Sequence, residues 1–126
     1  MGLFYYLKVR GGVLLQSIKL NKEFQAVFTS GKWFGAECLV IYIKENHKSI
    51  NRIGIAVGKK IAKSVMRNRI RRVIREAYRL QENTLKKGYD IVIVWKNGID
   101  LEKVKYDIVS KDLTKALQKA DLLKNE

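Results

Sequence analysis

The chain has 126 residues, which is enough for one domain with a single buried core. Hydrophobic residues make up 47% of it, which favours a folded globule, and 26 Lys and Arg against 12 Asp and Glu leave a net charge of +14, which indicates an anionic partner. Cys38 is the only cysteine and His47 the only histidine, which excludes an internal disulfide and a zinc site built from those two residue types, and a reducing, cytoplasmic location is expected. Charge alone leaves RNA, DNA and an anionic membrane open as partners.

The first residues differ in character from the rest of the chain. The apolar run at 3–7 is too short to span a bilayer, and it precedes the nearby positive charges, whereas a signal peptide has them in the opposite order. We therefore expect residues 1–12 to be a flexible tail, residues 13–120 to form one domain and residues 121–126 to be frayed.

A helix of about ten residues is predicted after Asn21, which can cap it, and Gly31 should end it. Phe24, Val27 and Phe28 recur at spacings of three and four, so they share one apolar face. Helical spacing by itself favours both phenylalanines as core residues, because such stripes usually pack.

Two of the strands that should follow this helix can be located in the sequence. Residues 38–44 are apolar and β-prone throughout, which predicts a central strand with Cys38 as a small buried residue rather than a nucleophile. The polar residues 45–51 should form a hairpin that leads into a second strand at 52–58. The period of two predicts two opposite faces for the first strand: Cys38, Val40 and Tyr42 on one, and Leu39, Ile41 and Ile43 on the other.

Residues 59–79, KKIAKSVMRNRIRRVIREAYR, carry nine basic residues and the single acid Glu76, and so hold +8 of the chain's +14. Wound as a helix, this segment separates into an apolar face and a basic face, with Arg69 at the boundary, where its stem can be buried and its head can reach outward. The apolar face comprises Ala62, Val65, Met66, Ile70, Val73, Ile74 and Ala77, and the basic face comprises Arg67, Asn68, Arg71, Arg72, Arg75 and Arg79.

The basic face is unlike an ordinary solvated helix surface. Solvated surfaces usually mix acids and bases at spacings of three and four, whereas here Arg71, Arg75 and Arg79 repeat every four residues and Glu76 is expected to reach Arg72 only. Like charges at that spacing cost stability, and the planar arginine fork suits phosphate. The pattern predicts a surface for nucleic acid.

A third strand is predicted at 89–95, after a basic loop at 83–88. Strand, helix and strand in succession favour a parallel pair joined by a crossover. Asp100 should cap a last helix, whose apolar stripe comprises Val109, Leu113, Ala116, Leu117 and Ala120. The fold class predicted is α+β, a single-domain αβββαβα sandwich with the long basic helix in a β-α-β crossover.

The segment KKIAKSVMRNRIRRVIREAYR resembles the signature of the bacterial ribonuclease P protein family, in which two lysines leave a strand and an Arg-Asn-Arg motif opens a long basic helix. The similarity runs from about Leu20 to Leu117, and it implies a left-handed crossover. Three positions depart from the family pattern: Gly58 replaces a small hydroxyl residue, Ala62 a glycine and Lys63 a polar residue. A side-chain phosphate contact at position 58 would therefore be missing.

The resemblance implies an auxiliary subunit of an endoribonuclease, which binds the catalytic ribonuclease P RNA and the single-stranded 5′ leader of precursor tRNA during Mg²⁺-dependent removal of that leader. Mg²⁺ is expected mainly on the RNA subunit and the substrate, and neither DNA nor a membrane is expected as a partner. The catalytic RNA would bind Lys59, Lys60, Lys63, Arg67, Asn68, Arg69, Arg71, Arg72 and Arg75. Phe24, Phe28 and Tyr42 would line a cleft for the leader.

The residues themselves leave some roles open. Asn68 can bond a base edge or brace an arginine, and Tyr42 can bond the RNA backbone or be a half-buried strand tyrosine. No catalytic or metal-binding residue is expected on this chain, because its acids are not grouped in a metal-ligand pattern and His47 falls in a loop.

Two other functions fit the basic helix. A general structural RNA-binding protein, such as a ribosome-associated one, would use the same helix without serving a nuclease. A DNA-binding module is disfavoured, because no helix-turn-helix or zinc pattern is present. Selective binding of leader-bearing tRNA through Phe24 and Phe28 would distinguish a ribonuclease P subunit from both of these alternatives.

Overall fold

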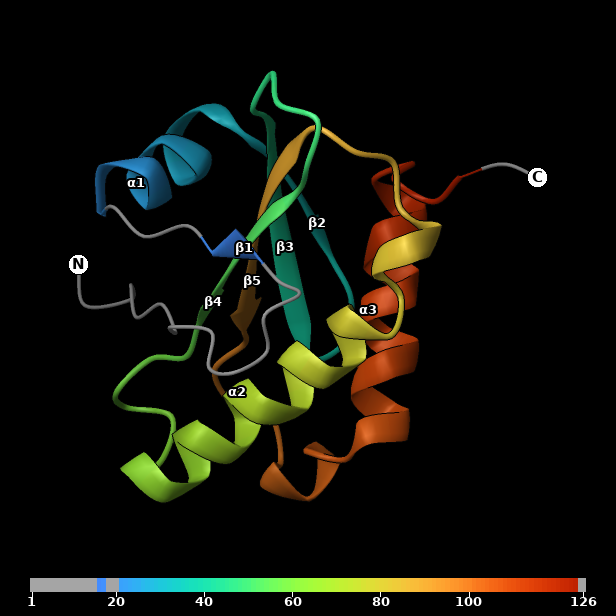
Figure 1. The fold of residues 1–126 in the computed structure, drawn as a ribbon. Helices are drawn as coiled ribbons and strands as arrows, with labels where there is room; N and C mark the ends of the chain where they lie inside the picture. The colour runs from blue at the N-terminus through green and yellow to red at the C-terminus, as the bar shows by residue number, and fades with distance from the viewer. Residues whose placement is uncertain (1–15, 18–20, 125–126) are drawn as a thin grey trace.

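Five strands form one sheet, in the order β1-β4-β5-β3-β2, in the computed structural model, which describes residues 16–17 and 21–124 (Figure 1). Three α-helices and two short 3-10 helices accompany the sheet. In chain order the elements are β1 (Gln16–Ser17), α1 (Asn21–Ser30), β2 (Lys32–Gly35), β3 (Leu39–Glu45), β4 (Arg52–Ala56), α2 (Ser64–Arg79), η1 (Glu82–Thr84), β5 (Tyr89–Trp95), η2 (Leu101–Lys103) and α3 (Tyr106–Lys119). The predicted α+β class and αβββαβα order are confirmed, with the two-residue β1 added in front.

The strand pairing confirms one prediction and corrects another. β4 and β5 pair in parallel, as the strand-helix-strand succession indicated. The predicted hairpin between residues 38–44 and 52–58 is wrong, because β5 lies between β3 and β4 and pairs with both. β5 is buried along nearly its whole length, so the interior of the sheet suits it better than an edge.

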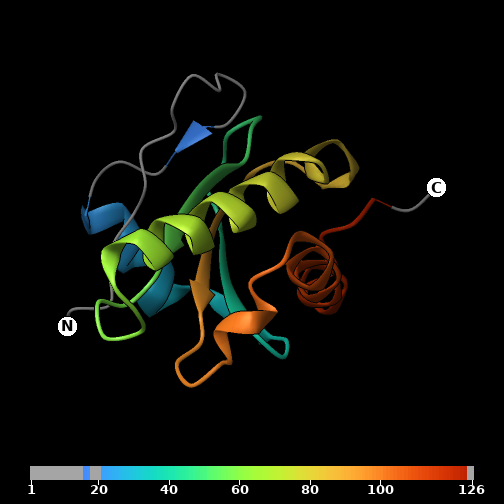
Figure 2. The same ribbon diagram turned by 90° about the horizontal axis from the view of Figure 1, so that it is seen from below.

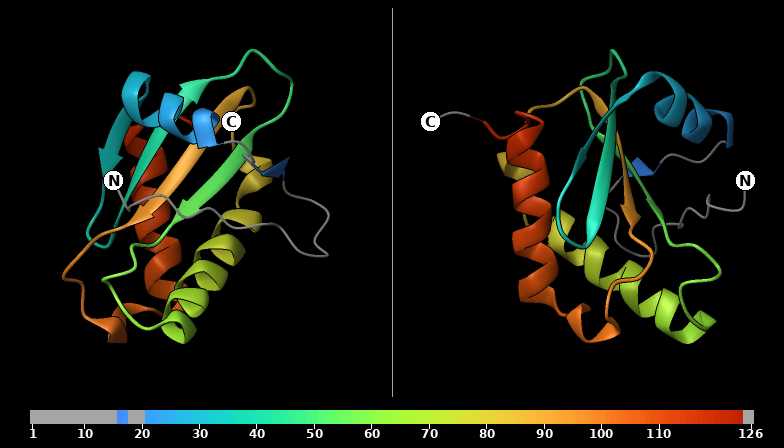
Figure 3. Two further views of the ribbon diagram at one scale, coloured as in Figure 1. Left: turned by 90° about the vertical axis from the view of Figure 1, so that its left-hand side faces the viewer. Right: turned by 180° about the vertical axis from the view of Figure 1, so that it is seen from behind.

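The helices cover the two faces of the sheet unequally. α1 lies on one face, and α2 and α3 lie on the other (Figure 3). In the left view of Figure 3, β4 and β5 run downward, α2 lies behind the sheet and β5 lies to the left of β4, so the crossover is left-handed. This is the hand that the resemblance implied, although most such crossovers are right-handed. Seen from below, α2 crosses the sheet beside α3, which is viewed along its axis (Figure 2).

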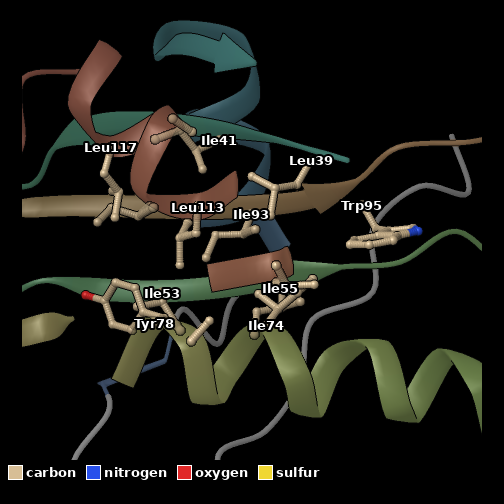
Figure 4. Packing of buried hydrophobic residues seen from close by; sticks show 14 of the residues in the cluster. Leu39, Ile41, Ile53, Ile55, Ile74, Tyr78, Ile93, Trp95, Leu113 and Leu117 are labelled. Carbon is tan, nitrogen blue, oxygen red and sulfur yellow. The ribbon is translucent and has the colours of Figure 1, made fainter. Parts of the chain in front are cut away.

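The main core fills the space between the sheet and the pair α2 and α3 (Figure 4). The period of two is confirmed for residues 39–43, because Leu39, Ile41 and Ile43 are buried here while Val40 and Tyr42 are half-buried on the other face. It is wrong for Cys38, which precedes β3 and lies in the main core. The buried residues labelled in Figure 4 come from β3, β4, β5, α2 and α3: Leu39, Ile41, Ile53, Ile55, Ile74, Tyr78, Ile93, Trp95, Leu113 and Leu117.

A smaller core lies beneath α1. Phe24 and Val27 of α1 are buried against Val92 of β5. Gly54 of β4 makes room for the Phe24 ring, since a Cβ at that position would stand 2.3 Å from Phe24 Cζ. α1 has the predicted bounds. It packs this closely on the sheet because Gly54 has no side chain.

The basic helix begins later than its apolar pattern suggested. α2 starts at Ser64, which places Ala62 in the preceding turn, outside the helix. Val65 is 79% exposed, so its prediction as an apolar-face residue is wrong. The first turn of α2 projects beyond the ends of the strands, where no core is available to cover that side chain (Figure 1). Ile70, Ile74 and Ala77 are buried as predicted.

The last helix also begins later than predicted. α3 starts at Tyr106, and Asp100 instead caps the short helix η2, where its Oδ1 accepts a hydrogen bond from the Glu102 N–H at 2.9 Å. The four residues at 109, 113, 116 and 117 of the predicted stripe are buried.

The chain beyond α3 is packed, so the predicted fraying is wrong for residues 122–124. Leu122 is buried, and its carbonyl accepts a hydrogen bond from the Lys86 N–H at 2.8 Å. Lys124 donates to the Thr84 carbonyl at 2.8 Å. The tail predicted at 1–12 lies outside the described residues. Within the described part of the chain, no helix combines the length and the apolar character needed to cross a bilayer.

Candidate nucleic-acid interface

The nine predicted RNA-binding residues lie together, on the turn after β4 and along α2. Lys60, Lys63 and Arg72 are exposed, as are Lys59, Asn68 and Arg69, whereas Arg67, Arg71 and Arg75 are half-buried. We call this set of nine residues the basic segment.

Arg67, the first arginine of the motif, is turned toward the protein. Its Nη1 donates to the carbonyls of Ala62 at 2.7 Å and Lys59 at 3.2 Å. One guanidinium therefore holds the turn that carries Lys59 and Lys60, because two backbone carbonyls of that turn share it as a donor. The sequence predicted an outward-facing RNA-binding arginine; the structure shows a bracing role for Arg67, and its contact with RNA stays a prediction.

Asn68 and Arg69 complete the motif. Asn68 Oδ1 accepts a hydrogen bond from Arg71 Nη1 at 2.8 Å. Of the two predicted roles, bonding a base edge or bracing an arginine, the structure shows the second. Arg69 Nη2 lies 3.4 Å from the Val104 carbonyl, which links α2 to the segment that precedes α3. The motif thus organises its own surroundings.

The acid on this helix has a different partner from the predicted one. Glu76 pairs with Arg79, whose Nη2 lies 2.7 Å from Glu76 Oε2, and the prediction that it could reach Arg72 only is wrong. Residues three apart on a helix are neighbours, and both of these side chains are well exposed. The hydrogen bond from Arg79 lowers the pKa of the Glu76 carboxyl.

The predicted aromatic residues form one cluster on the α1 face of the sheet. The rings of Phe28 and Tyr42 meet edge to face, with centroids 4.7 Å apart, and Phe24 lies 6.4 Å from Phe28. Phe28 and Tyr42 are half-buried, whereas Phe24 is 0% exposed. Phe24 is therefore a core residue, as its helical spacing favoured. It packs beneath the other two rings, and its own ring is not exposed to a ligand.

A charged network that the sequence did not reveal holds α1 to the sheet. Arg52 donates from Nε and Nη2 to both oxygens of Asp90, at 2.8 Å and 2.7 Å, and its Nη1 reaches Glu23 of α1 at 3.1 Å. Asn46 also donates to Asp90, at 2.9 Å. The hydrogen bonds that Arg52 donates to Asp90 raise the pKa of the guanidinium above its usual value. Arg52 and Asp90 are register partners in β4 and β5, a pairing that became visible only with the strand order.

One group of potential metal ligands occurs among the described residues, and it does not suit Mg²⁺. Asp112 accepts three backbone hydrogen bonds, from the N–H groups of Glu37 at 3.1 Å, Cys38 at 2.7 Å and Leu39 at 3.2 Å. Mg²⁺ prefers oxygen ligands in octahedral geometry, whereas this group includes a thiol and a carboxylate that already accepts three hydrogen bonds. Burial raises the pKa of the Cys38 thiol. Asp112 is a structural acceptor that fixes the turn between β2 and β3.

Comparisons with known proteins agree with the motif. A family model described as Ribonuclease P matches residues 15–121. A "Ribonuclease P protein component" from Clostridium acetobutylicum is 41% identical over 108 residues, which cover 84% of this chain and 89% of that protein. Another from Clostridium botulinum strain Langeland is 48% identical over 82 residues, covering 64% of this chain and 74% of that protein.

Solved structures give the same result. The fold matches the ribonuclease P protein of Thermotoga maritima with a TM-score of 0.76 and 28% identity, covering 82% of this chain and 96% of that one. It matches the Staphylococcus aureus protein with a TM-score of 0.73 and 25% identity, covering 86% and 97%. The Arg-Asn-Arg motif, the fold and the sequence similarity agree, and the chain belongs to the ribonuclease P protein family.

Proposed function

We propose that this chain is the protein subunit of a ribonuclease P, in which it binds the catalytic RNA through the basic segment and the 5′ leader of precursor tRNA through Phe28 and Tyr42. It assists the Mg²⁺-dependent endonucleolytic step that removes the leader and leaves the mature 5′ end. The observation that carries this proposal is the braced Arg-Asn-Arg motif at the start of α2, in a chain of this family.

The geometry of the basic segment supports a role in gripping folded RNA. Lys60 and Lys63 project from a turn that Arg67 holds, and Arg72 follows on the exposed side of α2. Cations in a fixed arrangement neutralise phosphates where RNA strands crowd together, and the released counterions favour binding. Contacts of this kind set the position and orientation of the RNA rather than read its sequence.

The aromatic cluster supports a role in holding single-stranded RNA. Phe28 and Tyr42 are half-buried, so part of each ring is available, and the buried Phe24 keeps Phe28 in place. Stacking on such rings contributes about 1 to 3 kcal/mol per base and tolerates any base, as a leader of variable sequence requires.

The chain's own contribution to cleavage is binding and positioning. Its one candidate ligand group among the described residues does not suit Mg²⁺, so the metal is expected on the RNA subunit and the substrate. Holding the leader on the protein while the catalytic RNA is bound to the basic segment would fix the scissile phosphate relative to the RNA.

The test is cleavage of precursor tRNA by the cognate ribonuclease P RNA at low Mg²⁺, with and without this protein. Wild type should restore cleavage at the mature 5′ end, and Lys60→Gln/Lys63→Gln should need more protein to reach the same rate. Lys111→Gln/Lys115→Gln is the matched control, because it removes the same charge from exposed positions on α3 and should behave as wild type. A folded wild type that binds this RNA but never promotes cleavage would leave only the general RNA-binding alternative.

The leader assignment has its own test within the same reconstitution. Phe28→Ala should weaken binding of precursor tRNA and leave binding of mature tRNA unchanged, because only the precursor carries the leader. Equal losses for both RNAs would count against the aromatic cluster as the leader site.

A further inference from the structure

Trp33 is a large apolar side chain that the sequence analysis did not single out. It lies in the edge strand β2 and is 66% exposed. Directly opposed residues of antiparallel strands project from the same face, and Trp33 opposes Tyr42 of β3. Trp33 therefore stands on the α1 face of the sheet, beside the cluster of Phe24, Phe28 and Tyr42.

The surroundings of the indole are also defined. A Cβ on Gly35 would lie 3.9 Å from three atoms: Trp33 Cζ3, Val40 Cγ2 and Lys96 Nζ. The ring therefore extends along β2 toward Gly35, and since all three atoms surround one point, Val40 Cγ2 and Lys96 Nζ each lie within 7.8 Å (twice 3.9 Å) of Trp33 Cζ3. Lys96 donates to the Ala36 carbonyl, which fixes the ammonium group and uses one of its three donors.

This position separates Trp33 from the other exposed apolar side chains. Single exposed apolar residues are common and need no explanation, and Ile50, Val65, Leu80, Leu101 and Tyr106 are of that kind. Trp33 differs because it continues a row of rings, from Phe28 through Tyr42 to the edge of the sheet, and because the Lys96 ammonium group lies within 7.8 Å (twice 3.9 Å) of its ring. An aromatic surface bordered by positive charge is the arrangement that binds single-stranded nucleic acid.

We propose that Trp33 is an additional leader-binding residue, which stacks on a nucleobase adjoining those held by Phe28 and Tyr42 while Lys96 contacts a neighbouring phosphate. The inference rests on the proposed function, since it lengthens the same leader site by one aromatic position. It also predicts that the site accommodates a longer stretch of leader than the two half-buried rings alone would hold.

Intrinsic fluorescence gives a direct readout of this stacking. The chain has two tryptophans, and Trp95 is buried in the main core at 1% exposure, so a change caused by a surface ligand reports on Trp33. Precursor tRNA added to the reconstituted holoenzyme should quench the emission more than mature tRNA does. In Trp33→Phe this leader-dependent difference should disappear.

Affinity measurements with the same holoenzyme test the energetic role. Trp33→Ala should weaken precursor tRNA by roughly 5- to 30-fold, the loss expected from one stacked base, and leave mature tRNA unchanged. Trp33→Phe should recover most of the affinity, because a ring is retained. Shortening the leader from its 5′ end should abolish the difference between wild type and Trp33→Ala. Tyr106→Ala, an exposed aromatic on α3 across the sheet, is the matched control and should bind both RNAs as wild type does.

The outcomes distinguish this inference from the proposed function. If Phe28→Ala loses leader affinity while Trp33→Ala binds precursor tRNA as tightly as wild type, the leader site stands and the Trp33 inference is overturned. If wild type itself does not prefer precursor over mature tRNA, the leader role fails and the inference fails with it. A leader-dependent quench with a selective loss in Trp33→Ala supports both.

Discussion

Single side chains in this protein hold backbone segments as often as they form surfaces. Asp112 of α3 is 4% exposed and accepts the N–H groups of three successive residues, 37 to 39. Arg67 donates to two carbonyls of the turn before α2. In both cases one ionised group satisfies several backbone atoms of a loop, and charge-assisted hydrogen bonds of this kind are stronger than neutral ones.

Replacing Asp112 therefore tests how much one buried carboxylate stabilises the fold. Asp112→Asn should lower the free energy of unfolding by about 2 to 4 kcal/mol, because the amide offers one acceptor oxygen and turns an N–H₂ group toward backbone donors. Urea denaturation measures the change. Asp107→Asn, an exposed acid in the first turn of the same helix, should cost less than about 1 kcal/mol. Equal losses in the two variants would contradict the role of Asp112.

The reactivity of Cys38 provides a second test at this scale. Burial raises the pKa of its thiol, so at any given pH the reactive thiolate fraction is smaller than for a free cysteine. The native protein should therefore react slowly with a disulfide reagent at pH 8, and the rate should rise steeply in urea. A native rate equal to that of a free thiol would show that Cys38 is accessible.

The sequence predicted those residues whose roles depend on local period, and it missed those whose roles depend on distant partners. Cys38 was expected in the core because it begins an apolar strand, and it is buried. Trp33 was overlooked because its importance comes from Tyr42 across the strand pair. Arg52 was equally hidden, since its partner Asp90 is distant in the chain and adjacent in the sheet.

At the scale of elements, an ion-pair network and a close packing contact hold α1 on the sheet. The Arg52 guanidinium pairs with both Glu23 and Asp90, and the Phe24 ring packs against Gly54, which has no side chain. Both act at the base of the aromatic cluster, so the position of Phe28 depends on them.

Gly54→Ala tests the packing of Phe24 against Gly54. The new methyl group would meet Phe24 Cζ at 2.3 Å, so the ring and α1 must shift, with an expected loss of about 1 to 3 kcal/mol in the free energy of unfolding. Leader affinity should fall as well, because Phe28 moves with the helix. Gly58→Ala is the stability control, since its Cβ would meet only Ile61, at 3.8 Å. Thermal denaturation of the two variants measures the contrast, and similar melting temperatures would rule out close packing at Gly54.

The existence of the elements was predictable, whereas their pairing was not. The residues of α1 and β5 were predicted closely, because helical and strand periods are properties of a short window. The hairpin between β3 and β4 was wrong because a turn-like loop reverses the chain without deciding which strand lies alongside. Here β5 takes that place, since its side chains are buried on both faces. The left-handed crossover was implied by the family resemblance alone.

At the scale of the whole molecule, charge is divided between a concentrated part and a dispersed part. The segment 59–79 holds +8 of the net +14, while the lysines of α3 are spread along a helix on the same side of the sheet. If RNA responded only to net charge, lysines in either place would be equivalent. A docked interface makes them different, because only cations in contact with phosphates release counterions.

The salt dependence of RNA binding separates these two cases. Lys60→Gln/Lys63→Gln should reduce the slope of log K against log salt concentration by about 1.4 to 1.8 in magnitude, corresponding to two lost phosphate contacts. Lys111→Gln/Lys115→Gln removes the same charge and should leave the slope at the wild-type value. Titrations of the ribonuclease P RNA at several salt concentrations give both slopes. Equal reductions of the slope in the two variants would mean that RNA binding depends on net charge alone. The basic segment would then not be the RNA interface.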